Sequence, residues 1–173
     1  MRELQIRRNG MSMIDEIKDH GLKEKLLRRT QKMLEAKVSD VMTRDVVTCD
    51  ARDPAAAAAR ICLENGFLGV LVMRDGVPLG TITVFDLLRL SYEDSLDIER
   101  NFLKVTVEQV IEGKEMVSVP PDAFLREALN LMISKKVRSL PVIDDGKIMG
   151  ILSYVDMVRW YRRTHDEVRT GKI

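Results

Sequence analysis

The chain has 173 residues, of which 45% are hydrophobic and 32% charged, a balance typical of a globular protein with a buried core. Its formal net charge of +1 excludes a strong overall positive field that would attract nucleic acid or an anionic membrane. No apolar run approaches the ~20 residues that span a bilayer, and the N-terminus, MRELQIRRNG, lacks the apolar stretch of a secretory signal. Cys49 and Cys62 form neither a C-x-x-C pair nor a disulfide framework, so we expect buried thiols, no membrane association and a cytoplasmic location.

Residues 1–37 are predicted to form an amphipathic helical extension. They carry ten Lys or Arg against six Asp or Glu, and Ser12 with Asp15 resembles a capping box. Basic and acidic residues are interleaved and aromatic residues are absent, which favours a helix packed on the domain over a nucleic-acid-binding arm. The apolar residues at roughly helical spacing are Ile14, Ile17, Leu22, Leu26, Met33 and Leu34.

Residues 46–92 are predicted to form a β-α-β-β-α unit. The short β-rich run VVTC precedes an alanine-rich helix within 53–66. Asp75-Gly76 separates two apolar runs, the pattern of a β-hairpin, and a closing helix is expected over about 84–92. Nearly continuous apolar strands such as VLVM indicate a sheet with one face covered by these helices.

A second copy of this unit follows, because positions 46–90 align with 116–160 without a gap at an offset of 70 residues. It repeats the β-rich run as MVSV and places its closing helix from Tyr154 to about His165. A repeat of this length that occurs twice indicates a duplicated domain rather than a solenoid. The identical pairs are Val47/Val117, Ala58/Ala128, Val72/Val142, Asp75/Asp145, Gly76/Gly146, Gly80/Gly150, Asp86/Asp156 and Arg89/Arg159.

We therefore predict an α/β (α+β) fold with two repeats. The expected boundaries are a helical extension at 1–37, a first domain at 38–97, a second domain at 98–165 and a C-terminal tail at 166–173.

In both copies a hydroxyl residue at the end of a strand is followed three positions later by an aspartate. The pairs are Thr83 with Asp86 and Ser153 with Asp156. One interpretation is an N-cap with its N3 carboxylate. The other is a binding site, because the free N–H groups at a helix start favour an anion and a carboxylate facing a cleft accepts the two hydroxyls of a ribose.

A catalytic site is not indicated. His20 and His165 are isolated, and neither cysteine has a basic partner nearby in the sequence. The chain has no Walker loop and no G-x-G-x-x-G segment. We expect no enzyme activity, no metal site and no required cofactor.

The segments VSDVMTRDVVTC, GVLVMRDGVPLGTITVFDLL and KKVRSLPVIDDGKIMGILSYVDMV resemble tandem CBS domains, the cystathionine β-synthase motif, paired as a Bateman module. The resemblance covers residues 38–92 and 107–161. It implies two β-α-β-β-α repeats packed through their sheets about a pseudo-twofold axis, with two clefts between them. Such clefts often bind AMP, ADP, ATP or S-adenosylmethionine, and such modules commonly dimerise through their helices into a flat disc.

The resemblance also implies the roles of particular residues. The ribose-binding aspartate falls on Asp86 and Asp156, its hydroxyl partner on Thr83 and Ser153, and the segments that line the adenine on 43–47 and 113–117. The expected ligand-binding residues are Thr43, Val46, Val47, Thr83, Asp86, Met116, Val117, Arg138, Ser153 and Asp156.

The two copies differ where related modules often carry a basic phosphate contact: the second has Arg138 and the first has Leu68. Met42-Thr43 matches the usual entrance, whereas IEGKEM carries an extra residue and no threonine. The two clefts are therefore predicted to be non-equivalent. The alternative for Arg138 is a surface arginine that precedes a strand.

The leading hypothesis is a non-enzymatic sensor of an adenosine ligand that forms a homodimer and signals to an effector protein, since no effector domain is recognised in the sequence. One alternative is a dimerisation platform whose clefts stay empty. Another is a nucleic-acid-linked regulator that uses the basic helix within 1–37. Which adenosine compound binds and which protein responds are left open by the sequence.

Overall fold

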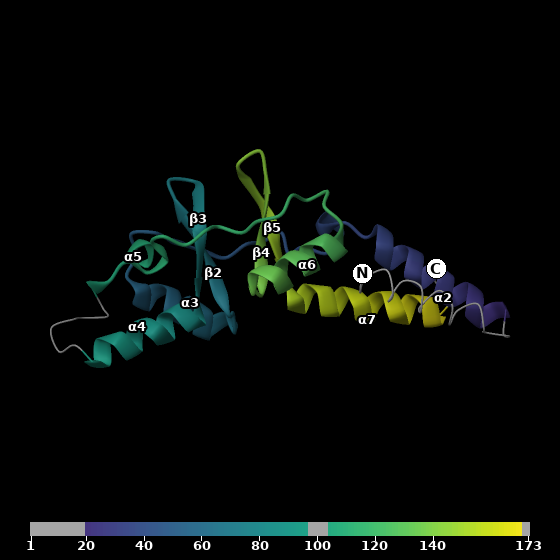
Figure 1. Cartoon of the computed structure of the whole chain (residues 1–173), viewed down its shortest axis with the longest axis horizontal. Helices are drawn as coiled ribbons and strands as arrows, with labels where there is room; N and C mark the ends of the chain where they lie inside the picture. The colour runs from purple at the N-terminus through teal and green to yellow at the C-terminus, as the bar shows by residue number, and fades with distance from the viewer. Residues whose placement is uncertain (1–19, 97–103, 171–173) are drawn as a thin grey trace.

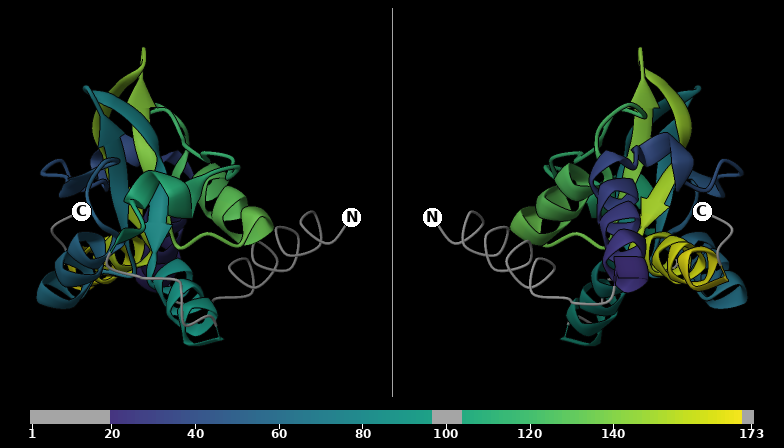
Figure 2. Two further views of the ribbon diagram at one scale, coloured as in Figure 1. Left: turned by 90° about the vertical axis from the view of Figure 1, so that its left-hand side faces the viewer. Right: turned by 90° about the vertical axis from the view of Figure 1, so that its right-hand side faces the viewer.

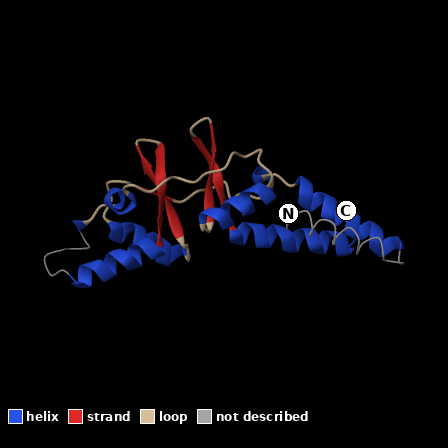
Figure 3. Cartoon of the chain, viewed as in Figure 1, coloured by secondary structure: helices blue, strands red, loops and turns tan. Residues whose placement is uncertain are grey.

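The computed structural model describes residues 20–96 and 104–170. The predicted two-repeat fold is confirmed: two β-hairpins stand next to each other near the middle of an elongated molecule, and helices extend to either side (Figure 1, Figure 3). The elements are α2 (His20–Glu35), the 3-10 helix η1 (Val38–Asp40), β1 (Thr48–Asp50), α3 (Ala55–Asn65), β2 (Gly69–Arg74), β3 (Val77–Thr83), α4 (Val84–Leu96), α5 (Val107–Ile111), α6 (Leu125–Lys135), β4 (Ser139–Asp144), β5 (Lys147–Ser153) and α7 (Tyr154–Thr170).

Both hairpins turn at an Asp-Gly pair, as predicted. In each turn the aspartate and the glycine have positive φ, 51° and 81° at Asp75-Gly76 and 46° and 74° at Asp145-Gly146. Positive φ at both central residues is the geometry that matches the right-handed twist of the flanking strands. When the molecule is viewed down its long axis, the hairpin turns project on one side and the closing helices α4 and α7 lie on the opposite side (Figure 2).

The two repeats differ in their first strand. In the first repeat β1 pairs with β2 in parallel, and the N–H of Ala51 extends this ladder to the carbonyl of Met73 at 2.9 Å. In the second repeat the predicted MVSV strand is reduced to a single parallel bridge between Val119 and Val142. The position equivalent to Ala51 is Pro121, which has no N–H to donate, so the ladder stops.

The hydrophobic core of each repeat includes residues from the segment that leads into the other repeat. The core of the first repeat includes Val107, Val110 and Ile111 of α5, and the core of the second includes Val38 and Met42. The chain therefore crosses from one repeat to the other at both entrance segments, 43–47 and 113–117. This crossing places those segments between the two sheets.

Helix α2 has no fully buried side chain. Its contacts with the second repeat are therefore made by polar and partly buried residues. Met33 packs against the core of the second repeat, and Lys32 forms an ion pair with Glu167 of α7 at 2.8 Å. α7 runs to Thr170, beyond its predicted end near His165, and it contacts α2 on both sides of that point, through Tyr161 with Arg29 and through Glu167 with Lys32. The cap predicted at Ser12 and Asp15, with the apolar Ile14 and Ile17, lies outside the described residues.

Candidate functional site

A cavity of about 540 Å³, here called the first cleft, lies between the two repeats. Its walls are the end of β3 with the start of α4, the entrance segment at 114–117, and the residues before and at the start of β4. It brings together five of the predicted ligand residues, which come from both repeats: Thr83, Asp86, Met116, Val117 and Arg138.

Asp86 caps α4 with one carboxylate oxygen and leaves the other for a different partner. Its Oδ2 accepts the backbone N–H of Thr83 at 2.8 Å and the Thr83 hydroxyl at 2.6 Å, and the Asp86 N–H donates back to Thr83 Oγ1 at 3.3 Å. This is a reciprocal capping box, so the predicted cap is confirmed. Because the cap uses only Oδ2, it is compatible with a binding role for Oδ1.

The partner of Asp86 Oδ1 is the ammonium group of Lys114. The aspartate side chain is only 7% exposed, and a buried carboxylate needs such a partner. Burial raises the pKa of Asp86, but the hydrogen bonds from Lys114 and Thr83 outweigh it and hold the pKa below its usual range. The carboxylate is therefore ionised at neutral pH and able to accept hydrogen bonds.

Sequence reasoning did not identify Lys114 as a site residue. The signal was present, because the run IEGKEM departs from the usual entrance, has no threonine and contains Lys114. Glu115, next to it, lines the same cavity and forms an ion pair with Lys135 at 2.8 Å.

The wall of the first cleft that belongs to the second repeat is basic. Two of its lining residues are Lys136 and Arg138. Lys136 ends α6 with its backbone in the left-handed conformation, at φ 55°. Both are exposed, and neither forms an ion pair with any residue that the structure describes. Arg138 lies in the same cavity as Asp86, as predicted. Together with Lys136 it gives the cleft two cationic groups in addition to the ionised carboxylate.

The equivalent residues of the second repeat are arranged similarly but with a neutral partner. Asp156 Oδ2 accepts the N–H of Ser153 at 2.8 Å, and Asp156 Oδ1 accepts the hydroxyl of Thr43 at 3.0 Å. Thr43 also pairs with Ile151 of β5 through two backbone hydrogen bonds of 2.9 and 2.8 Å. The predicted non-equivalence therefore has a structural counterpart, a hydroxyl at Asp156 where Asp86 has an ammonium group.

Val46 and Val47 follow Thr43 along the same entrance segment. Val46 is half-buried and Val47 is exposed, and neither lines either of the two cavities described for this part of the chain. Their predicted contact with an adenine stays a prediction.

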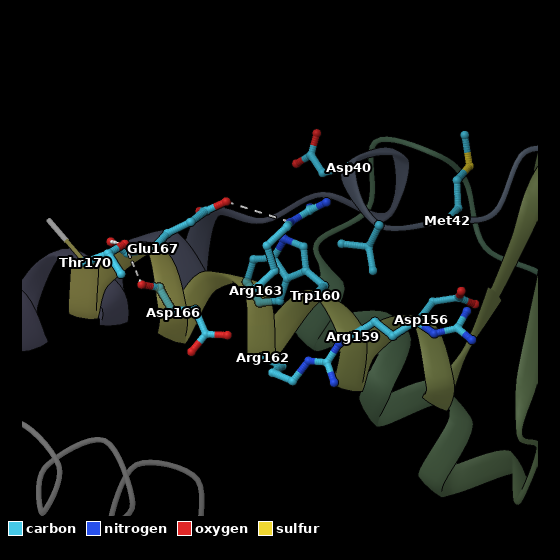
Figure 4. A pocket seen from close by; sticks show the side chains of 11 residues that line it. Asp40, Met42, Asp156, Arg159, Trp160, Arg162, Arg163, Asp166, Glu167 and Thr170 are labelled. Atoms are coloured by element: carbon cyan, nitrogen blue, oxygen red, sulfur yellow. Dashed lines mark hydrogen bonds and ion pairs between the residues drawn. The ribbon is translucent and has the colours of Figure 1, made fainter. Parts of the chain in front are cut away.

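A second, more open cavity of about 790 Å³ runs along α7, and sequence reasoning did not identify it. Asp156 and Met42 lie at one end, and Trp160 and several arginines line it, as Figure 4 shows. Although this cavity is larger, Asp156 is the one predicted ligand residue that lines it. The first cleft is the stronger candidate site, since it combines a buried carboxylate with cations from the opposite repeat.

The family of the chain follows from two matches to one family model. The CBS domain model matches residues 38–93 and 107–163, which together make up more than half of the chain. The chain belongs to the CBS-domain family, and it carries two copies of the domain. No catalytic family is indicated by these matches.

Curated relatives include archaeal proteins of several lengths. The protein MK0525 of Methanopyrus kandleri is 28% identical over 129 residues, which are 73% of this chain and 63% of the relative. MJ1225 of Methanocaldococcus jannaschii is 24% identical over 131 residues, 72% of this chain and 46% of the relative. MJ1426 of the same organism is 34% identical over 150 residues, 70% of this chain and 88% of the relative. The chain thus spans less than two thirds of MK0525 and less than half of MJ1225.

Solved structures show the same fold. A structure of CBSX2 in complex with AMP has a TM-score of 0.65 at 26% identity, and covers 75% of this chain and 98% of that one. The CBS-domain containing protein ATU1752 from Agrobacterium tumefaciens has a TM-score of 0.64 at 26% identity, with 75% and 95% covered. The CBS domain pair of MJ0100, in complex with 5-methylthioadenosine and S-adenosyl-L-methionine, has a TM-score of 0.63 at 18% identity, with 74% and 97% covered.

Proposed function

We propose that this chain is a regulatory module that binds an adenosine-containing ligand in the first cleft. The observation that carries the proposal is the buried, ionised carboxylate of Asp86, which faces a cavity whose opposite wall holds Lys136 and Arg138. A carboxylate that accepts two ribose hydroxyls and cations that bind a phosphate are the groups that a nucleotide requires.

Each part of a nucleotide has a matching wall in the first cleft. The ribose lies at Asp86 and Thr83, and the phosphate at Arg138. The adenine packs against Met116 and Val117, which are partly buried and line the same cavity. The complex of CBSX2 with AMP, at 26% identity, supports this class of ligand.

A screen of melting temperatures tests the proposal directly. AMP, ADP, ATP, S-adenosylmethionine and methylthioadenosine are compared with GTP as the control. A ligand that binds only the folded chain stabilises it by about 2.7 kcal/mol at a hundredfold excess over its Kd. We expect at least one adenosine compound to raise the melting temperature and GTP to leave it unchanged. No shift with any adenosine compound would contradict the proposal and favour a platform with empty clefts.

Signalling is proposed to proceed through a homodimer. The helices carry exposed apolar side chains at equivalent positions of the two repeats, such as Leu63 of α3 with Ile133 of α6. Exposed apolar residues that gather on one face of a soluble protein mark an interaction surface. A ligand bound between the repeats changes how they sit relative to this surface, and an effector protein responds to that change.

The alternative role in nucleic-acid binding has less support. In α2, Arg28 is paired with Glu24 at 2.7 Å and Lys32 with Glu167 at 2.8 Å, so part of its positive charge is neutralised within the chain. Salt-dependent binding of nucleic acid would be the sign that favours this alternative.

The compartment is also part of the proposal. Among the described residues no helix has the length and apolar character needed to cross a membrane. Cys49 and Cys62 are buried free thiols, and burial raises the pKa of Cys49 to about 11, so almost no reactive thiolate is present at neutral pH. We propose a cytoplasmic module, where adenosine ligands are available and thiols stay reduced.

A further inference from the structure

The two equivalent aspartates differ in the partner of one oxygen. In both, Oδ2 is held by the strand end of its own repeat, by Thr83 at Asp86 and by Ser153 at Asp156. Oδ1 of Asp156 accepts a neutral hydroxyl, whereas Oδ1 of Asp86 accepts the ammonium group of Lys114. The oxygen of Asp86 that a ribose would use is therefore already bound by a cation of the other entrance segment.

A ligand that displaces Lys114 from Asp86 must offer the released ammonium group another anion. The Asp86 side chain is 7% exposed, so its carboxylate is shielded from water and leaving it without a partner is costly, although Lys114 itself is 35% exposed. The two hydroxyls of a ribose replace Lys114 at Asp86 but leave the ammonium group without an anion. A phosphate on the same ligand supplies that anion.

The geometry allows Lys114 to change partners. It lines the same cavity as Lys136 and Arg138, and its flexible four-carbon side chain carries a rotatable ammonium group. Its backbone is fixed at the end of α5, where the Lys114 N–H donates to the carbonyl of Ile111 at 3.0 Å. The side chain can therefore move while the entrance segment keeps its place.

We propose that Lys114 is a specificity-determining residue that exchanges partners, from Asp86 in the free chain to the phosphate of the ligand in the complex. This inference rests on the proposed function and narrows its ligand class to phosphorylated adenosine compounds for the first cleft. A neutral nucleoside binds there more weakly, because it breaks the ion pair and offers nothing to the released ammonium group. The neutral contact between Thr43 and Asp156 imposes no such requirement on a ligand of Asp156.

The test compares AMP with adenosine by calorimetry on the full chain, with Asp156→Ala present throughout so that the first cleft dominates the signal. Lys114→Met removes the cation from both of its proposed partners. AMP should bind about tenfold more weakly, because a charge-assisted contact is lost. Adenosine should bind about threefold more tightly, because no ion pair has to be broken. The opposite signs of the two changes are the signature of an exchange.

Two further variants make the test specific. Lys147→Met removes a lysine of equal charge that is exposed at the start of β5 and lines neither cavity, and it should change neither affinity. Lys114→Arg keeps the cation and should retain the preference for AMP. Melting temperatures without ligand verify that each variant is folded.

Each alternative result has a distinct meaning. A loss of affinity for both ligands in Lys114→Met would show that the lysine only positions the entrance segment, and would overturn the exchange. A loss for AMP with adenosine unchanged would show a phosphate contact without exchange, and would also overturn it. If neither ligand binds the Asp156→Ala chain, with or without Lys114→Met, the proposed function of the first cleft is itself wrong.

Discussion

At the scale of single residues, Asp86 and Asp156 show that capping and binding are compatible roles for one carboxylate. Each aspartate holds its own helix start through Oδ2 and turns Oδ1 toward a group from the other repeat. Thr83 and Ser153 are therefore needed for the local fold whether or not a ligand binds. The two roles can be separated only by measuring stability and affinity in the same variants.

Alanine substitutions at the two aspartates provide that separation. Asp86→Ala and Asp156→Ala should each lower the free energy of unfolding by about 0.5–2 kcal/mol, because each removes a cap. Asp86→Ala should also weaken AMP binding by about tenfold or more at a temperature where the variant is fully folded. Chemical denaturation gives the first quantity and calorimetry the second.

The matched control is Glu127→Ala, which removes the carboxylate that accepts the Phe124 N–H at the start of α6. It should cost a similar amount of stability and leave AMP affinity unchanged. If AMP binds both aspartate variants as tightly as the unmutated chain, the carboxylates act as caps alone.

At the scale of elements, the entrance segments depend on how closely they approach the sheets. A Cβ atom added to Gly150 would lie 2.7 Å from the carbonyl oxygen of Thr43 and 2.8 Å from the sulfur of Met42. The equivalent Gly80 has more room, since its added Cβ would meet Ile111 Cδ1 at 3.4 Å. The same glycine of the repeat is therefore required for close packing in one copy and nearly free to change in the other.

The pair of substitutions Gly150→Ala and Gly80→Ala measures this difference. Gly150→Ala should lower the free energy of unfolding by about 1–3 kcal/mol, because the backbone at Thr43 has to move. Gly80→Ala should be nearly neutral, since the end of a flexible Ile111 side chain can adjust. Denaturant unfolding of both variants decides the matter. Equal losses would mean that the contact of Thr43 with β5 is looser than the structure shows.

At the scale of the whole molecule, helices of both repeats present apolar side chains to the solvent. Leu63 is 84% exposed on α3, and Val158 is 67% exposed on α7. Neither lines the first cleft or the cavity along α7. Charges introduced there would disturb self-association while leaving the proposed ligand site unchanged.

The double variant Leu63→Glu with Val158→Glu should therefore convert the proposed homodimer into a monomer. The control is Val77→Glu, at an exposed apolar residue beside the turn of the first hairpin, which should remain dimeric. Sedimentation velocity at micromolar concentration measures both. A monomer in the unmutated chain, or a double variant that stays dimeric, would rule out dimerisation through these helices.

Much of the fold is determined by local chemistry and could be predicted from the sequence. The two Asp-Gly turns require positive φ, and the caps at Thr83 and Ser153 use residues three positions apart, so both features depend on neighbours in the chain. The duplication predicted the same elements in the second copy. It failed at MVSV, where Pro121 removes an N–H that the first copy uses, because a repeat pattern does not show which backbone donors are needed.

The composition of the candidate site was decided by tertiary structure. Asp86 and Lys114 belong to different repeats, and they meet because α5 packs into the core of the first repeat before the chain crosses to the second. Sequence alone determined which residue types recur at each helix start. Only the packing of one repeat against the other decided that one aspartate faces a lysine and the other a threonine, because an ion pair between distant segments depends on where the chain crosses and not on local spacing.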